Sequence, residues 1–167
     1  MRLPAETIYQ AIFAQACSIN TPKAGGAPSL TPLATMSRRW VHWDQAGDYP
    51  MPALYQMEPP DGINFVRPQR GVIKYELTAF LYFYFAVDSG NLNIPFSPTL
   101  NAYFNAVDLA FQPSIEALNG KPNQGGRQQL GLGPGIEECW IDGRVVFDEG
   151  LLAPPGLLKF TVKAICG

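Results

Sequence analysis

Residues able to do catalytic chemistry are few in this chain of 167 residues. His42 is the only histidine, and it lies between Trp40 and Trp43 in a segment of strand-like composition. We expect this imidazole to pack in a core or an interface, because a histidine-dependent triad needs Ser or Cys partners that the sequence does not mark. No HExxH, CxxC or Walker pattern occurs. The sequence therefore predicts no catalytic residue and no enzyme.

Two other groups resemble functional motifs but lack the surroundings that such motifs need. The glycine-rich run 131–135 precedes a predicted strand instead of a helix and contains a proline, which has no amide donor. We predict a connector there and not a phosphate-binding loop. The acidic pairs 137–138 and 148–149 flank a predicted turn, where they are expected to form a negative tip beside a partner and not to act in acid–base catalysis.

The three cysteines, Cys17, Cys139 and Cys166, are odd in number and far apart. This pattern predicts reduced thiols in the core of a cytosolic product, and neither a disulfide framework nor a metal site. Neither cofactor-binding nor metal-binding residues are expected.

The composition favours a subunit of an assembly. Charged residues make up 16% of the chain, against about 25% in an average protein, while 47% of residues are hydrophobic. A surface poor in charge is typical of a chain that buries surface against other subunits. The net charge of -2 argues against capture of nucleic acid by the whole domain. We expect neither a signal peptide nor a membrane-spanning segment.

The segment 72–87 is the most informative part of the chain. Side chains alternate between the two faces of a strand, so its odd positions form one continuous apolar row suited to a core. Its even positions begin mixed and end with the aromatic residues Phe80, Tyr82 and Tyr84. A monomer with one covered sheet face has no need for three rings on the other face. We interpret this aromatic row as an assembly surface.

The remaining elements follow from periodicity and from helix-breaking residues. A helix is expected over residues 4–18, and a second from Ser97, with Pro98 in its first turn, to just before Pro113. Further strands are predicted at 35–44, 53–58 and 157–165, and a hairpin is predicted from 138–141 and 144–147 around a two-residue turn at Asp142 and Gly143.

Long loops are expected at 20–34, 59–71 and 119–135, where glycine and proline are frequent, and a hairpin excursion is the alternative for 59–71. The predicted order of elements is one helix, three strands, one helix and three strands. This order indicates a single α+β domain over residues 1–167, with an antiparallel sheet and two helices packed on one face.

Four arginines are candidate contact residues. Arg38 and Arg39 are adjacent in a predicted strand, so they would point to opposite faces, and the outward one would suit a salt bridge between subunits. Arg67 and Arg70 lie in the predicted loop 59–71. Two isolated arginines are too few for a DNA surface, and a solvated loop is the preferred interpretation.

This order of elements resembles the tail terminator and tail completion proteins of long-tailed bacteriophages. The resemblance lies in the leading helix, the long third strand, the helix that opens at 97–101 and the closing segment 140–145. Segments 51–56 and 157–165 also support it, so that the resemblance covers most of the chain. It implies a structural virion protein of the tail or neck, assembled in the host cytoplasm, without catalytic residues.

The resemblance also implies the partners of the chain. Copies would form a homo-oligomeric ring, typically a hexamer, on the last ring of the tail tube protein. The ring would stop tube growth and bind the head-side connector or neck protein, and also the sheath if the tail contracts. DNA would only pass through the lumen, and no membrane or cofactor is implied. The residues predicted to form the interface are Phe80, Tyr82, Tyr84, Arg38, Arg39, Arg67, Arg70, Asp142 and Gly143.

Two alternatives stay open at this point. The first is another virion position, such as the tail tube, head completion or the baseplate side. The second is a cytosolic ligand-binding module or small enzyme with an apolar pocket. A ring requires a head-to-tail interface made of two different patches on each subunit, whereas a ligand-binding module predicts a monomer.

Overall fold

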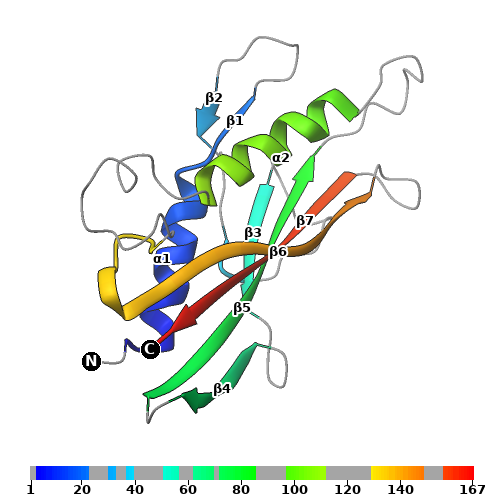
Figure 1. Cartoon of the computed structure of the whole chain (residues 1–167). Coiled ribbons are helices and arrows are strands. Elements are labelled where there is room, and N and C mark those ends of the chain that lie inside the picture. Colours follow the sequence, from blue (N-terminus) through cyan, green and yellow to red (C-terminus); the bar gives the residue numbers. More distant parts are fainter. Residues whose placement is uncertain are drawn as a thin grey trace.

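The computed structural model of the protein shows an antiparallel sheet with two helices on one of its faces (Figure 1). This arrangement confirms the predicted α+β class. The structure describes residues 3–22, 30–32, 37–39, 51–56, 62–69, 72–85, 97–111, 129–148 and 156–167.

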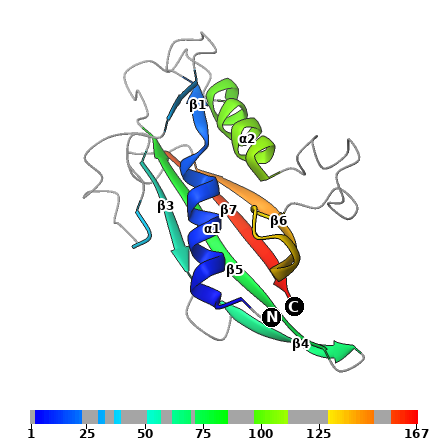
Figure 2. The ribbon, with the colours of Figure 1, turned by 90° about the vertical axis from the view of Figure 1, so that its left-hand side faces the viewer.

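The first helix, α1, spans Ala5–Cys17 and confirms the helix predicted over residues 4–18. Pro4 precedes it with an extended backbone and, lacking an N–H, leaves no donor unsatisfied there. The helix buries residues at helical spacing, Ile8, Tyr9, Ile12 and Ala16. Figure 2 shows α1 running along the sheet.

The second helix, α2, spans Ser97–Phe111 and confirms the helix predicted before Pro113. Val107 and Phe111 are buried against the sheet. The Phe104 ring stacks on Phe160, with the ring centroids 6.1 Å apart and the planes at 20°. Leu109, on the outer side of the helix, is 71% exposed. Neither described helix is long and apolar enough to cross a membrane.

The main sheet has the strand β5 at its centre. Its strands are β3 (Met51–Gln56), β4 (Ile63–Gln69), β5 (Val72–Phe85), β6 (Ile136–Asp148) and β7 (Gly156–Cys166). β5 pairs along one edge with β3 and β4 and along the other with β7, which in turn pairs with β6, all antiparallel. The 14 residues of β5 confirm the long strand predicted from residue 72, and β7 confirms the strand predicted at 157–165.

The core lies between the helices and one face of this sheet. The predicted odd row of β5 is buried (Tyr75, Leu77, Ala79, Leu81 and Phe83), as is the predicted even row of β7 (Leu158, Phe160, Val162 and Ala164). The Tyr9 hydroxyl of α1 lies 3.1 Å from the Gly62 carbonyl oxygen and 3.2 Å from the Thr78 carbonyl oxygen. This buried polar contact holds α1 in register with the start of β4 and the middle of β5.

The predicted hairpin at 138–147 is wrong, because β6 runs as one strand through Asp142 and Gly143. Asp142 faces Thr161, and Val146 faces Lys159. The chain therefore advances by four residues in β6 where it advances by only two in β7. Gly143 has φ +68°, whereas Asp142 does not have a positive φ. The tight hairpin turn typical of Asp-Gly needs positive φ at both residues, so this pair forms a bulge that keeps β6 beside β7.

Two predicted loops contain strands. β4 lies within 59–71 and forms a hairpin with β5, where Gln69 faces Val72. Residues 20–34 contain β1 (Asn20–Pro22) and β2 (Leu30–Pro32), which pair with each other. Prolines are tolerated in both places, because these are edge strands and β4 has a register shift between Val66 and Gln69.

Other predictions fall partly outside the described residues. Within the strand predicted at 35–44, only Ser37, Arg38 and Arg39 are described; here the chain bends, and the Ser37 Oγ accepts the Arg39 N–H at 3.1 Å. In the loop predicted at 119–135, the described part ends in the short 3-10 helix η2 (Gly133–Gly135). The strand predicted at 53–58 corresponds to β3, which begins and ends two residues earlier than predicted.

Replacement of Phe160 by alanine tests the core between the helices and the sheet. The ring is fully buried and contacts Phe83 and Phe104. Phe160→Ala is expected to lower the free energy of unfolding by about 3–5 kcal/mol, measured by urea denaturation at one protein concentration. Phe65→Ala is the matched control, because Phe65 is 71% exposed; its cost is expected to stay within about 0.5 kcal/mol. Equal costs for the two variants would contradict this core.

Candidate functional site

The sheet face opposite the helices carries three of the side chains predicted to form an interface, Phe80, Tyr82 and Asp142. We call it the second face. Residues that are paired directly across antiparallel strands share a face. The register therefore places on the second face the residues Phe80 and Tyr82 of β5, Lys159, Thr161 and Lys163 of β7, and Trp140, Asp142 and Val146 of β6.

Phe80 and Tyr82 form an aromatic pair beneath a lysine. Their ring centroids are 6.1 Å apart with an edge-to-face angle of 65°. The Lys159 Nζ lies 3.7 Å from the Phe80 centroid and 5.5 Å from the Tyr82 centroid, within the range of cation–π attraction. Both rings are half-buried. They lie on the face expected from the sequence, but Lys159 covers part of the apolar surface that was expected to need a partner.

Tyr84, the third predicted ring, lies in β5 opposite Leu157 of β7. The register therefore places its backbone position on the second face. Its side chain lies outside the described part of the structure.

An ion-pair network occupies the neighbouring rows of the second face. The Lys163 Nζ lies 3.1 Å from the Glu76 Oε1 and 3.1 Å from the Asp142 Oδ2. The Trp140 indole Nε1–H donates to the Asp142 Oδ1 at 3.2 Å. These contacts tie β5, β7 and β6 together. Asp142 is thus an ion-pair partner of Lys163 within the sheet, and it does not lie at the tip of a turn.

The hydrogen bonds of this network shift the pKa values of Asp142 and Lys163. The hydrogen bond from Lys163, and then that from Trp140, lower the pKa of the Asp142 carboxyl. The hydrogen bonds to Asp142 and then to Glu76 raise the pKa of Lys163. A carboxylate held ionised in this way is suited to bind a cation and not to act as a general acid.

Lys159 differs from the other lysines on the described strands in its contacts. Lys163 has two carboxylate partners, and Lys74 has Glu137 with its Nζ 2.5 Å from the Oε1. Within the described part of the chain, Lys159 contacts only the faces of Phe80 and Tyr82 and no carboxylate. Among the described residues, its ammonium therefore interacts with aromatic rings and not with an ion-pair partner.

Arg38 binds within the chain. Its guanidinium forms a two-pronged ion pair with Glu6 in the first turn of α1, and the Arg38 Nη2 donates to the Glu6 Oε2 at 3.0 Å. The hydrogen bond from Arg38 lowers the pKa of Glu6. The predicted placement of Arg38 on one face of a strand is wrong, because the chain bends there.

The other predicted arginines contribute little to the second face. Arg39 is exposed on the same bend as Arg38. Arg67 lies in β4 at the register shift, and its side chain is outside the described part; Arg70 is outside it altogether. Gly143 is exposed at the bulge of β6. The structure therefore brings together Phe80, Tyr82 and Asp142, while the arginines lie apart from them or outside the description.

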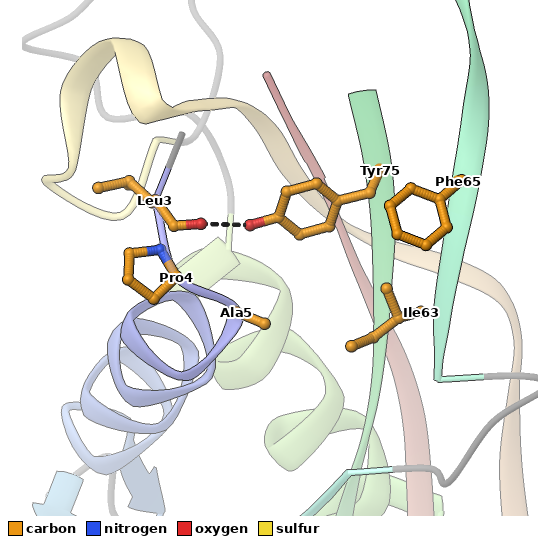
Figure 3. Close-up of a pocket in the computed structure, with 6 residues that line it drawn as sticks. All are labelled: Leu3, Pro4, Ala5, Ile63, Phe65 and Tyr75. Carbon is orange, nitrogen blue, oxygen red and sulfur yellow. Dashed lines mark hydrogen bonds between the residues drawn. The ribbon is translucent and has the colours of Figure 1, made fainter. Parts of the chain in front are cut away.

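An apolar pocket lies at the other side of the sheet, between the start of α1 and the hairpin of β4 and β5 (Figure 3). It has a volume of about 380 Å³. The Tyr75 hydroxyl at its wall donates to the Leu3 carbonyl oxygen at 2.6 Å, so this polar group is already satisfied. Its lining residues are Leu3, Pro4, Ala5, Ile63, Phe65 and Tyr75. Sequence reasoning missed this pocket, because three separate segments form it.

The candidate catalytic groups do not form a reactive site in the described residues. Cys139 and Cys166 are buried, and burial raises the pKa of Cys139 to about 12, which keeps it a neutral thiol. Among the described residues, no group of three or more His, Cys, Asp or Glu side chains is placed to hold a metal ion. His42 lies outside the described residues.

No protein-family model matches this chain, and no curated protein matches it with significance. A function must therefore be inferred from the geometry of the second face and from the order of the elements.

Asp142→Asn tests the ion-pair network on the second face. The folded protein lowers the pKa of Asp142 below its ordinary value of 3.8. The carboxylate therefore stabilises the fold at neutral pH, and this contribution is lost as the pH falls below 3.8 through the folded-state pKa. We expect the variant to be less stable than the parent at neutral pH, with the difference narrowing in acid, as measured by urea denaturation across that range.

Glu138→Gln on the same strand is the control, because Glu138 has no ion pair among the described contacts. A stability difference for Asp142→Asn that stays constant down to low pH would show that Lys163 does not stabilise this carboxylate.

Proposed function

We propose that this chain is a structural subunit of a long-tailed bacteriophage, a tail terminator that caps the tail tube as a ring and binds the head-side connector. The observation that supports this proposal is the second face. It carries an aromatic pair, with a lysine over the rings, on the side of the sheet that α1 and α2 do not cover.

The energetics of the second face favour its burial by another subunit. Phe80 and Tyr82 are half-buried, and Val146 beside them is 44% exposed. Removing apolar surface from water contributes about 25 cal/mol for each Å². Aromatic side chains also provide rigid contact area at a small cost in side-chain entropy. A neighbour that covers this face would therefore gain affinity without rearranging the sheet.

The mechanism of a terminator is steric and needs no reactive group. A closed ring uses two different patches on each subunit, so that every copy offers one patch to each neighbour. In this proposal, the ring occupies the position where the next ring of tube protein would bind, and tube growth stops. The opposite side of the ring receives the head-side connector, and DNA passes through its lumen. The protein would thus belong to the virion tail or neck.

Electron microscopy of the purified protein tests this function. Single closed rings are expected in negatively stained samples. Long stacks of rings would instead support the alternative position in the tail tube, since tube proteins polymerise. A monodisperse monomer at high concentration, measured by analytical ultracentrifugation, would contradict both virion proposals.

The apolar pocket favours a second candidate, a small ligand-binding module. Its volume of about 380 Å³ and its apolar lining resemble those of sites for small hydrophobic molecules. A monomer whose melting temperature rises with a small apolar ligand, and no longer does so when Ile63 is replaced by tryptophan to fill the pocket, would support this candidate.

Tyr82→Asp tests the assembly role of the second face. The substitution removes a ring from the half-buried pair and is expected to leave the monomer folded, since Tyr82 lies outside the core. We expect the variant to lose ring formation while its circular dichroism spectrum stays unchanged. Ala14→Asp on the exposed side of α1 is the charge-matched control and should still form rings. Intact rings for Tyr82→Asp, seen by light scattering, would contradict the assignment.

A further inference from the structure

The apolar pocket between α1 and the hairpin of β4 and β5 has two aromatic walls. Phe65 of β4 lies directly opposite Tyr75 of β5 in the strand register, so both residues lie on the helix side of the sheet. Ile63, two residues before Phe65, lies on the same face of β4. Figure 3 shows these side chains across from residues 3–5 at the start of α1. The pairing of β4 with β5 and the approach of α1 therefore shape the pocket together.

Phe65 exposes an unusually large part of its ring at this pocket. Among the described residues, four large apolar side chains are exposed, and Phe65, at 71%, is the only aromatic one. Its cross-strand neighbour Tyr75 is only 2% exposed. An exposed ring beside an apolar concavity is the arrangement found at many ligand sites. A molecule in the pocket would cover part of the Phe65 ring.

The lining of the pocket offers no partner to a charged group. None of the six lining residues that the structure describes carries a charged side chain. The polar side-chain group among them, the Tyr75 hydroxyl, donates its proton to the Leu3 carbonyl oxygen at 2.6 Å. Moving an ion from water into such surroundings carries a large free-energy penalty when no partner compensates its charge. The lining therefore favours a neutral apolar molecule.

The rest of the subunit holds the walls of the pocket in place. Tyr75 is buried in the core and is hydrogen-bonded to Leu3. The Leu3 side chain packs against Gly135, where an added Cβ would collide with it. Pro4 has a fixed φ and directly precedes the first turn of α1. Because these walls are fixed before binding, a ligand would enter with little loss of conformational entropy in the protein.

We propose that this pocket binds a neutral, flat aromatic molecule that stacks on Phe65 and lies against residues 3–5. The inference rests on the second candidate function, for which it names the ligand class, and it does not require ring formation. The volume of about 380 Å³ lies near the lower end of the range for ligand pockets, roughly 300–1,000 Å³, and suits about one or two fused rings. A flat ring is favoured because aromatic pairs gain from stacked or edge-to-face contact beyond the area that they bury.

Isothermal titration calorimetry with three probes tests the ligand class. The probe 2-naphthol is a neutral molecule of two fused rings, 2-naphthoate carries a negative charge on the same rings, and 1-octanol is a neutral chain without a ring. We expect 2-naphthol to bind at least about tenfold more tightly than 2-naphthoate, because the lining has no partner for a carboxylate. It should bind at least about threefold more tightly than 1-octanol, which cannot stack on Phe65. Equal or tighter binding of either other probe would overturn the ligand class.

Substitutions of Phe65 locate the binding of 2-naphthol. Phe65→Leu keeps an apolar side chain but removes the ring, and it is expected to weaken binding about three- to tenfold. Phe65→Tyr keeps the ring and should bind like the parent protein. Leu109→Ala is the matched control, because Leu109 is also 71% exposed but lies on α2, outside the pocket lining.

Melting temperatures without a probe confirm that each of these variants is folded, as expected for changes at exposed side chains. Unchanged binding of 2-naphthol by Phe65→Leu, or an equal loss in Leu109→Ala, would overturn this site.

The outcomes separate this inference from both candidate functions. If 1-octanol binds in the pocket and 2-naphthol does not, the aromatic ligand class is overturned, while the ligand-binding candidate stands. If none of the three probes binds, the inference and the ligand-binding candidate both fail, while the ring function is unaffected. Sedimentation velocity without a probe tests the ring function separately. A monomer that binds 2-naphthol at Phe65 would overturn the ring function and support this inference.

Discussion

The alternation of side chains along β5 is the constraint on which the rest of the structure depends. β5 pairs with other strands along both edges, so its side chains can only point to the two faces of the sheet. Its described odd positions, from Tyr75 to Phe83, are buried in the core beneath the helices. Its even positions must then lie on the second face, where Phe80 and Tyr82 contact Lys159. A shift of one residue in register would exchange the two faces and destroy the core.

The second face combines an ion-pair network with an aromatic pair that is only half-buried. Lys163, Asp142 and Trp140 satisfy one another across two strands. The Lys159 ammonium lies over the Phe80 ring and near the Tyr82 ring, and both rings remain half-buried. A surface of this kind is rigid before it binds, which lowers the entropic cost of association. The same rigidity suits the ring that we propose, which would present a fixed shape to its neighbours.

The sequence predicted those elements whose signals are local. The helices and the strands β5 and β7 each carry their own periodicity, and β5 was predicted with its buried row correct. The strand β4 and the continuous course of β6 were not predicted, because local signals in both segments indicate turns. Pro68 within β4 and the Asp-Gly pair within β6 are normally turn signals, and only pairing with β5 and β7 overrides them.

The candidate interface was predicted only in part, for a similar reason. Alternation along β5 places Phe80 and Tyr82 on the second face, since this depends on one strand alone. The contacts of Lys159 and Lys163 depend on the register of β5, β7 and β6, which a single sequence does not reveal. Likewise, the ion pair between Arg38 and Glu6 joins a bend to the first turn of α1, two segments that are far apart in the sequence. Long-range pairing therefore decides which charges remain for a partner.

Chemical labelling of lysine amines in the assembled and dissociated protein tests the central claim most directly. If copies cover the second face, acetylation of Lys159 should slow markedly as the protein concentration rises and assemblies form. A labelling rate for Lys159 that is the same in assemblies as in dilute subunits would show that the second face stays open to solvent, and would contradict its role as an assembly surface.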